Sequence, residues 1–247
     1  MMYLAFASIM TFFSTLLGGL FALHLKDRLH LILGFSAGAV IGVAFFDLIP
    51  EALELGAGHF ETGTIISVMA IGFLLYLIFD RLVFFHHHDE HSQESDISHS
   101  RHTNRGVLGA GSLSIHSFLD GVAVGVAFQV SVSVGLVVTL AVLAHDFSDG
   151  INTVNMISRG GGSRKEAFRW LLLDAFAPIL GVLSTFLFTL SSKWLGLLLA
   201  LFSGFFLYIG ASDLLPESHH RHPKFWTTFM TLLGVALLYL IVFFAQI

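Results

Sequence analysis

Residues 116–155 read HSFLDGVAVGVAFQVSVSVGLVVTLAVLAHDFSDGINTVN, and the expected fold follows from this stretch. It consists of two apolar segments, and each carries a polar insert of the form H-x-F-x-D-G, at residues 116–121 and 145–150. Within each insert the His and the Asp are four residues apart, so they share one face of a helix. Ionisable side chains deep in an apolar helix are costly and indicate a functional site. Two inserts on consecutive helices predict that their side chains act together.

The whole chain has the composition of a polytopic membrane protein. Of its 247 residues, 55% are hydrophobic and 12% are charged, and the mean hydropathy is +0.82. Soluble domains carry about 25% charged residues. The net charge of −5 says little, because the charges are sorted by position along the chain. From the hydrophobic composition we expect a lipid bilayer as partner, and no nucleic acid. Cysteine is absent, so any metal must bind to nitrogen and oxygen atoms.

Eight hydrophobic runs are long enough to cross a bilayer as helices. We therefore expect an all-α fold with one transmembrane domain over residues 1–247. The first run has no basic segment before it, so we expect a retained helix and not a cleaved signal. The polar, His-rich segment 86–105 is expected to be a disordered loop. The expected helices span residues 3–23, 31–55, 64–85, 106–129, 132–157, 166–190, 194–217 and 224–246.

The basic residues predict how the helices are oriented in the membrane. If the N-terminus lies outside, every one of the 12 Lys and Arg residues except Lys193 falls on the inner side. This is the distribution that the positive-inside rule describes. An even number of helices then places both termini outside and the segment 86–105 in the cytoplasm. The short chain without a cleavable signal favours a bacterial or archaeal inner membrane, with a eukaryotic organelle as the alternative.

A second repeat appears near the two ends of the chain. Residues 47–51 read DLIPE and residues 213–217 read DLLPE, on helices that run in opposite directions. This predicts an inverted repeat, in which helices 1–3 are mirrored by helices 6–8 around a central pair, a 3+2+3 arrangement. For one copy alone, a carboxylate at a helix end in the headgroup layer explains the pattern, whereas two mirrored copies favour a transport pathway. The expected pathway residues are Asp47, Glu51, Asp213 and Glu217, with Asn152 as a weak donor on the central pair.

The two H-x-F-x-D-G inserts supply ligands for a divalent metal ion. Antiparallel packing of the central helices brings both inserts to one depth, and small residues such as Gly121, Gly125, Gly135 and Gly150 are expected to let these two helices approach closely. Two imidazoles and two carboxylates suit Zn²⁺ best, and Fe²⁺, Mn²⁺, Co²⁺ and Cd²⁺ also fit. The expected ligands are His116, Asp120, His145 and Asp149.

Other polar side chains leave alternatives open. Asp146 either leans into the same site or forms a second one, with Ser117 as a weak donor. Asp174 is a further ligand, a proton acceptor or an Asp paired with a backbone donor. The His-rich segment 86–105 either binds metal loosely or is a solvated tail. An exit site near the second DLxPE copy is suggested by three histidines, His219, His220 and His222.

At these residues the chain resembles the Zrt/Irt-like (ZIP) family of divalent-metal transporters, over essentially its whole length. Residues 116–121 resemble the family's H-N-x-x-[DE]-G signature, and residues 145–150 resemble its H-E-x-P-x-[DE] counterpart. Residues 208–217 resemble its helix 7 pattern ending in D-x-L-P-E. Ser117 stands where Asn is usual, the usual helix 5 Pro is missing, and Ala177 stands where some bacterial members have a Glu. These departures put a two-metal centre in doubt.

The resemblance implies uptake of Zn²⁺ or a similar ion into the cytoplasm, with the metal as transported substrate and no catalytic cofactor. It also implies the four ligands His116, Asp120, His145 and Asp149, a homodimer, and an elevator-like alternating-access mechanism. One rival interpretation is an intramembrane zinc hydrolase, which needs an open coordination position and a general base. The sequence has no H-E-x-x-H motif, so we expect a transporter and not an enzyme. A metal channel or sensor is the other alternative.

Overall fold

The structure is a computed structural model, and it describes residues 2–22, 29–85, 98–219 and 225–245. All regular structure within these ranges is helical, and eight helical stretches in them are long and apolar enough to cross a membrane. The predicted all-α, polytopic fold is therefore confirmed. In chain order the elements are α1 (Met2–Phe21), α2 (Leu29–Val43), η1 (Ala44–Leu48), α3 (Ile49–Gly56), α4 (Thr62–Phe85), α5 (Ser98–Val130), α6 (Val132–Arg159), α7 (Arg164–Ser184), η2 (Thr185–Leu187), α8 (Ser192–Tyr208), η3 (Ile209–Leu214), α9 (Leu215–His219) and α10 (Phe225–Ala245).

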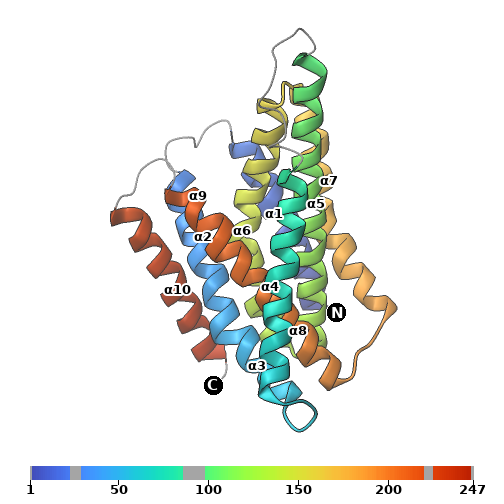
Figure 1. Cartoon of the computed structure of the whole chain (residues 1–247), viewed down its shortest axis with the longest axis vertical. Coiled ribbons are helices and arrows are strands. Elements are labelled where there is room, and N and C mark those ends of the chain that lie inside the picture. Colours follow the sequence, from blue (N-terminus) through green and yellow to red (C-terminus); the bar gives the residue numbers. More distant parts are fainter. Residues whose placement is uncertain (1, 23–28, 86–97, 220–224, 246–247) are drawn as a thin grey trace.

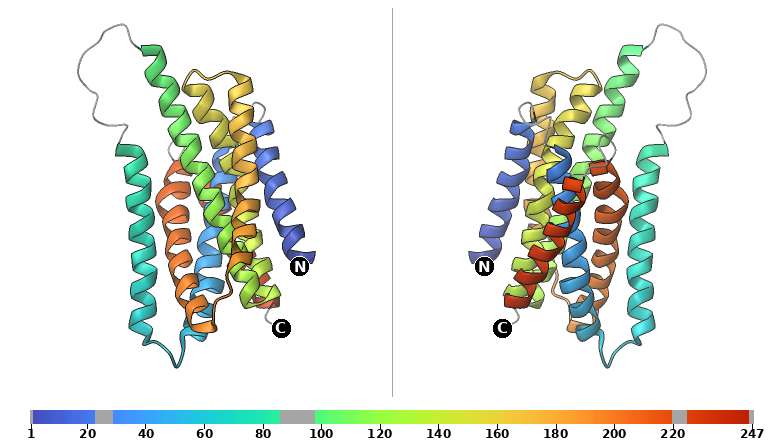
Figure 2. Two further views of the ribbon diagram at one scale, coloured as in Figure 1. Left: turned by 90° about the vertical axis from the view of Figure 1, so that its right-hand side faces the viewer. Right: turned by 90° about the vertical axis from the view of Figure 1, so that its left-hand side faces the viewer.

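The spanning helices lie side by side in one elongated bundle (Figure 1). Figure 2 shows that the start of α1 and the end of α10 lie at the same end of this bundle, which we call the terminal end. The end of α4 and the start of α5 lie at the opposite end. An even number of spans places the two termini at the same end of the bundle.

Two helix boundaries differ from the expected ones by three residues or more. α5 begins at Ser98 and not at residue 106, so part of the expected loop 86–105 is helical, while residues 86–97 lie outside the described chain. Hydropathy detects only the apolar part of a helix and misses a polar extension beyond the bilayer. α7 and η2 end at Leu187 and not at residue 190, because Gln129 binds the backbone there. Its side-chain amide donates to the carbonyls of Thr185 and Phe188, both at 3.1 Å.

Both copies of the DLxPE motif coincide with π-helical segments. In η1 the N–H of Ile49 donates to the carbonyl of Ala44, and in η3 the N–H of Leu215 donates to the carbonyl of Gly210. Each bond spans five residues, whereas an α-helix spans four. A proline follows directly in each copy, and its ring nitrogen has no hydrogen to donate. Two spans related by the inverted repeat thus carry the same irregularity at the same place.

Four helix pairs are in close contact through reciprocal glycines. A Cβ added at any of these glycines would lie 1.9–2.3 Å from a backbone oxygen of the partner helix, so no larger residue fits. The pairs α1–α6 and α5–α7 correspond to each other under the inverted repeat, as do α2–α10 and α4–α8. This supports the 3+2+3 arrangement independently of the motifs. The glycine pairs are Gly18 with Gly150, Gly121 with Gly181, Gly38 with Gly234, and Gly72 with Gly204.

The expectation that glycines bring the two central helices together is largely wrong. Gly121 faces the backbone of α7, Gly125 faces Thr185 of η2, and Gly150 faces the backbone of α1. Only Gly135 of α6 faces α5, where it accommodates the ring of Phe128. A small-residue stripe in a sequence indicates that a helix is approached closely, but not which neighbour approaches it.

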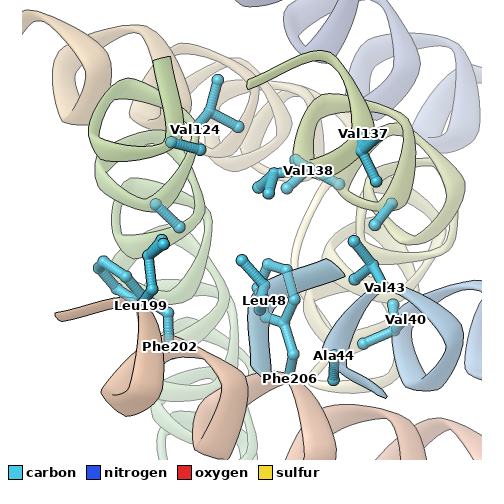
Figure 3. Close-up of a cluster of buried hydrophobic side chains, with 14 of the residues drawn as sticks. Val40, Val43, Ala44, Leu48, Val124, Val137, Val138, Leu199, Phe202 and Phe206 are labelled. Carbon is cyan, nitrogen blue, oxygen red and sulfur yellow. The ribbon is translucent and has the colours of Figure 1, made fainter. Parts of the chain in front are cut away.

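The helices form two groups, and the contact between them matters for the site. α1, α5, α6 and α7 pack on one another, and we call them the α1 group. The remaining helices, the α2 group, pack as α2 with α10 and α4 with α8, and α3 and α9 complete it. Toward the terminal end, buried apolar side chains fill the space between the groups (Figure 3). This apolar cluster comprises Val124, Val137 and Val138 from the α1 group and Val40, Val43, Ala44, Leu48, Leu199, Phe202 and Phe206 from the α2 group.

Candidate metal centre

The polar inserts of α5 and α6 meet inside the bundle. Their two imidazoles and two carboxylates each offer one ligand atom, and these four atoms all lie within 4.8 Å of one another. All four residues are buried, with exposed fractions between 0% and 5%. The structure therefore brings together the residues that the sequence singled out, and we call them the four-residue cluster: His116, Asp120, His145 and Asp149.

Two features of the chain place these side chains opposite one another. α5 and α6 are antiparallel neighbours separated only by Ser131, whose hydroxyl caps α6 by accepting from the N–H of Val134 at 3.1 Å. The spacing of four within each insert then directs His and Asp from each helix toward the common space. Nε2 of His116 lies 3.2 Å from Oδ2 of Asp120.

The environment of His145 sets the position of its ring proton. Its Nδ1 lies 2.9 Å from the carbonyl oxygen of Ala141, one turn earlier. Because a carbonyl only accepts, Nδ1 carries the proton and Nε2 of the neutral ring holds a lone pair. That lone pair faces Oδ2 of Asp120 at 3.3 Å. Two acceptors in this arrangement are stable only with a cation between them, either a proton or a metal ion, so the donor set fits a metal substrate.

His116 has a different partner on its second nitrogen. Its Nδ1 lies 2.7 Å from the hydroxyl oxygen of Tyr76 on α4. Its Nε2 faces Asp120 and also Oδ2 of Asp149, at 3.4 Å. The metal-facing nitrogen of both histidines is therefore Nε2, and both rings are held from behind, as is usual for metal-binding imidazoles.

Asp174 is buried beside the cluster but is engaged elsewhere. The hydroxyl of Ser117 donates to its Oδ1 and the hydroxyl of Thr153 donates to its Oδ2, both at 2.7 Å. Of the alternatives for Asp174, the structure favours a paired carboxylate, although the donors are side-chain hydroxyls and not a backbone group. Ser117 correspondingly points its hydrogen at Asp174. A ligand role for either residue stays a prediction.

Asp146 is a buried carboxylate that, among the residues the structure describes, lacks hydrogen-bond donors of the kind that surround Asp174. It has an exposed fraction of 0%, and neither of its oxygens has a hydrogen-bond partner within the described part of the chain. The carboxylates of Asp120, Asp149 and Asp174 are near enough to repel it. Burial of an unpaired charge is strongly unfavourable. Asp146 therefore increases the need for a cation in this region.

Four of the expected pathway residues belong to the two DLxPE copies, which lie in η1 and α3 and in η3 and α9. Asp47, in η1, is 5% exposed and its Oδ2 has no partner among the described residues, while Glu51 of α3 is half-buried. Asn152 is half-buried on α6. Asp213 and Glu217 belong to η3 and α9, but their side chains are outside the described part, as is that of His219. His220, His222 and the histidines of residues 86–97 lie outside the described chain altogether.

Sequence reasoning missed two residues of this region. Tyr76 is the tyrosine of the apolar helix α4, and Thr153 follows the second insert on α6. Neither belongs to a spacing pattern with the inserts, so no periodicity points to them. A tyrosine in mid-span is the one available signal, because its hydroxyl needs a partner when buried.

Comparisons with known proteins agree with the resemblance. A family profile described as ZIP Zinc transporter matches residues 84–242. The protein named Zinc transporter ZupT from Corynebacterium aurimucosum is 26% identical over 239 residues, which cover 91% of this chain and 90% of that protein. Zinc transporter ZIP9-B from Xenopus laevis is 25% identical over 234 residues, 78% of this chain and 76% of the relative. Zinc transporter ZIP4 from Homo sapiens is 32% identical over 118 residues, 47% of this chain and 18% of the relative.

Proposed function

The chain belongs to the ZIP zinc transporter family, and we propose from this premise that it carries Zn²⁺ into the cytoplasm through the four-residue cluster. Membership makes it a multi-pass membrane protein that transports divalent metal ions, and not an enzyme. The proposal adds the metal, the ligands, the direction and the mechanism.

The observation that carries the proposal is the donor set of the cluster. Two imidazole nitrogens and two carboxylate oxygens within 4.8 Å of one another match the four-coordinate sites in which Zn²⁺ is held. His145 offers a lone pair at Nε2, and Asp120 faces both rings. The other first-row divalent ions compete for such a site, and nitrogen ligands favour Zn²⁺ over Mn²⁺.

The inward direction rests on charge. We assign the cytoplasm to the end of the bundle where α4 ends and α5 begins. At this end α7 starts with Arg164 and Lys165, whereas Lys193, at the start of α8, lies near the terminal end. The membrane potential of an energised cell, negative inside, favours movement of a divalent cation toward that end. We also propose an inner-membrane location and a homodimer, of which the family resemblance implies the homodimer.

An alternating-access mechanism is supported by the division into two groups of helices. All four ligands belong to α5 and α6 of the α1 group. The apolar cluster lies between the groups, and its α5 and α6 members are closer to the terminal end than the proposed ligands are. Because these side chains are apolar, they offer no hydrogen bonds to a hydrated ion, and its passage past them would need a change in the arrangement of the two groups. Movement of the α1 group along the α2 group would expose the ligands to one side at a time.

Zinc flux into proteoliposomes tests the proposal. The full chain should give uptake that saturates with zinc concentration and is accelerated by zinc inside the vesicle, since counterflow is characteristic of a carrier. Protein-free vesicles give the background. Flux that rises linearly with concentration and shows no counterflow would indicate a channel, and absence of zinc flux alongside manganese flux would overturn the assignment of the metal.

A further inference from the structure

A tyrosine from outside the two central helices reaches a residue of the cluster. The hydroxyl oxygen of Tyr76, on α4, lies 2.7 Å from Nδ1 of His116. The two rings meet edge to face, with centroids 5.7 Å apart and an interplanar angle of 83°. Both side chains are buried, with exposed fractions of 9% and 4%.

The chemistry of a phenol differs from that of the carbonyl behind His145. When a metal ion occupies Nε2 of a neutral imidazole, the proton is on Nδ1 and needs an acceptor. The carbonyl of Ala141 meets this need for His145, and the hydroxyl oxygen of Tyr76 meets it for His116. A hydroxyl also donates, so Tyr76 holds the ring of His116 in the same orientation before and after metal binds, and less order must be gained on binding. Phenylalanine does neither.

An aromatic cluster holds Tyr76 in place. Its ring centroid lies 5.3 Å from that of Tyr208 and 5.6 Å from that of Phe205, both on α8. The ring of Tyr208 supplies this contact, while its hydroxyl donates to Oδ2 of Asp80 at 2.6 Å. Aromatic contacts at such separations stabilise beyond their area of burial. The position of the Tyr76 hydroxyl is therefore determined by α4 and α8, independently of His116.

The hydrogen bond joins the two groups of helices. Tyr76 and the aromatic cluster belong to the α2 group, whereas His116 belongs to the α1 group. A displacement of one group by a single helical turn, about 5 Å, would break a contact of this kind. The orientation of His116 is thus supported in the arrangement described here and loses that support when the groups move.

We propose that Tyr76 is a positioning residue for His116. Its hydrogen bond raises the zinc affinity of the cluster in this arrangement of the helices, and the affinity falls when the groups move and the bond breaks. The inference rests on the proposed function and assigns a role to a residue outside the two motifs. Removal of the hydroxyl should weaken zinc binding, because partners behind a metal ligand typically contribute about 10- to 100-fold in affinity.

The test compares Tyr76→Phe with Tyr208→Phe in the full-length protein. Zinc affinity is measured with purified protein against a chromophoric chelator, and the half-saturating concentration and maximal rate are measured in proteoliposomes. Y76F should raise the dissociation constant of the purified protein by about 10-fold or more. The half-saturating concentration for uptake should rise by less, because uptake begins from the arrangement in which this hydrogen bond is broken, and the maximal rate should stay within about twofold of the native value. Y208F removes a buried hydroxyl from the same aromatic cluster but leaves the His116 bond, so it should bind zinc like the native protein.

Three outcomes would overturn the inference. The first is native zinc affinity in Y76F, the second is loss of maximal rate alone in Y76F, and the third is a weakening of zinc binding in Y208F as large as that in Y76F. In all three cases the native protein still binds and transports zinc, so the proposed function stands. If the native protein itself neither binds nor transports zinc, the proposed function fails and the role of Tyr76 fails with it. Thermal unfolding of both variants checks that the aromatic cluster is intact.

Discussion

His116 and His145 present the same nitrogen to the same carboxylate, but different atoms lie behind them. His145 is bound by its own helix, and His116 is bound by a helix of the other group. One of the two proposed ligands is therefore oriented by its own helix, while the other depends on tertiary packing. This difference explains why a site built from two similar inserts need not have two equivalent halves.

Replacement of ligands gives the first prediction at this scale. His116→Ala and Asp149→Ala should each reduce zinc flux to the background of protein-free vesicles, while membrane insertion and yield stay near native. Ser114→Ala is the matched control, because Ser114 is buried on the same helix and donates only to the carbonyl of Ala110. Near-native flux in both alanine variants would refute the assignment of the ligands.

The buried carboxylates next to the cluster give a second prediction. Asp146→Leu replaces a buried carboxylate that has no hydrogen-bond partner by an apolar side chain of similar size, so without metal the variant should unfold at a higher temperature than the native protein. Asp174→Asn should unfold at a lower temperature, since the amide nitrogen cannot accept from Ser117 or Thr153, and a buried donor without a partner costs about 1–3 kcal/mol. Equal shifts of the same sign in the two variants would contradict this account.

The inserts at residues 116–121 and 145–150 made the four-residue cluster predictable, because a spacing of four fixes a common helix face. The partners behind the ligands were not predictable in the same way. Tyr76 and Ser117 reach their partners over sequence separations of 40 and 57 residues, and only tertiary packing determines which side chains meet at such distances. Asp174 shows the consequence, since the sequence left three roles open and the hydroxyls around it favour one.

At the scale of the elements, the glycine pairs determine how closely the helices approach. Hydropathy predicted the eight spans to within a few residues, since the bilayer sets their length. It did not predict which spans form pairs, nor the π-helical segments η1 and η3, because both depend on backbone packing and hydrogen bonding. The proline in each DLxPE copy signalled an irregularity but not its kind.

The close approach of α1 and α6 gives a third prediction. In Gly150→Ala the new Cβ would lie 1.9 Å from the backbone oxygen of Thr15, so the two helices must separate and Asp149 must move with α6. We expect a lower unfolding temperature and loss of zinc transport. Gly63→Ala is the control, because a Cβ there has no atom within 4 Å and alanine is about 1 kcal/mol better than glycine in a helix. Native behaviour of Gly150→Ala would show that the described helix contact is wrong.

At the scale of the whole molecule, the proposed direction of transport rests on the proposed topology. The native chain has no cysteine, so single cysteines report accessibility without background. His59→Cys lies in the exposed connection between α3 and α4, and Ser158→Cys lies at the exposed end of α6. In intact cells an impermeant thiol reagent should label residue 59 and should reach residue 158 only after permeabilisation. The reverse pattern would invert the topology and remove the basis for inward transport.

The α1 group carries the proposed ligands, and the α2 group supplies Tyr76 and most side chains of the apolar cluster. All of these roles depend on metal binding at the junction of α5 and α6. The X-ray absorption spectrum at the zinc edge, recorded on the full-length protein with one equivalent of zinc, tests this most directly. We predict a four-coordinate ion with two imidazole nitrogens at about 2.0–2.1 Å, oxygen atoms in the remaining positions, and loss of one imidazole in His145→Ala. A shell of oxygen atoms alone, unchanged in that variant, would contradict the central claim.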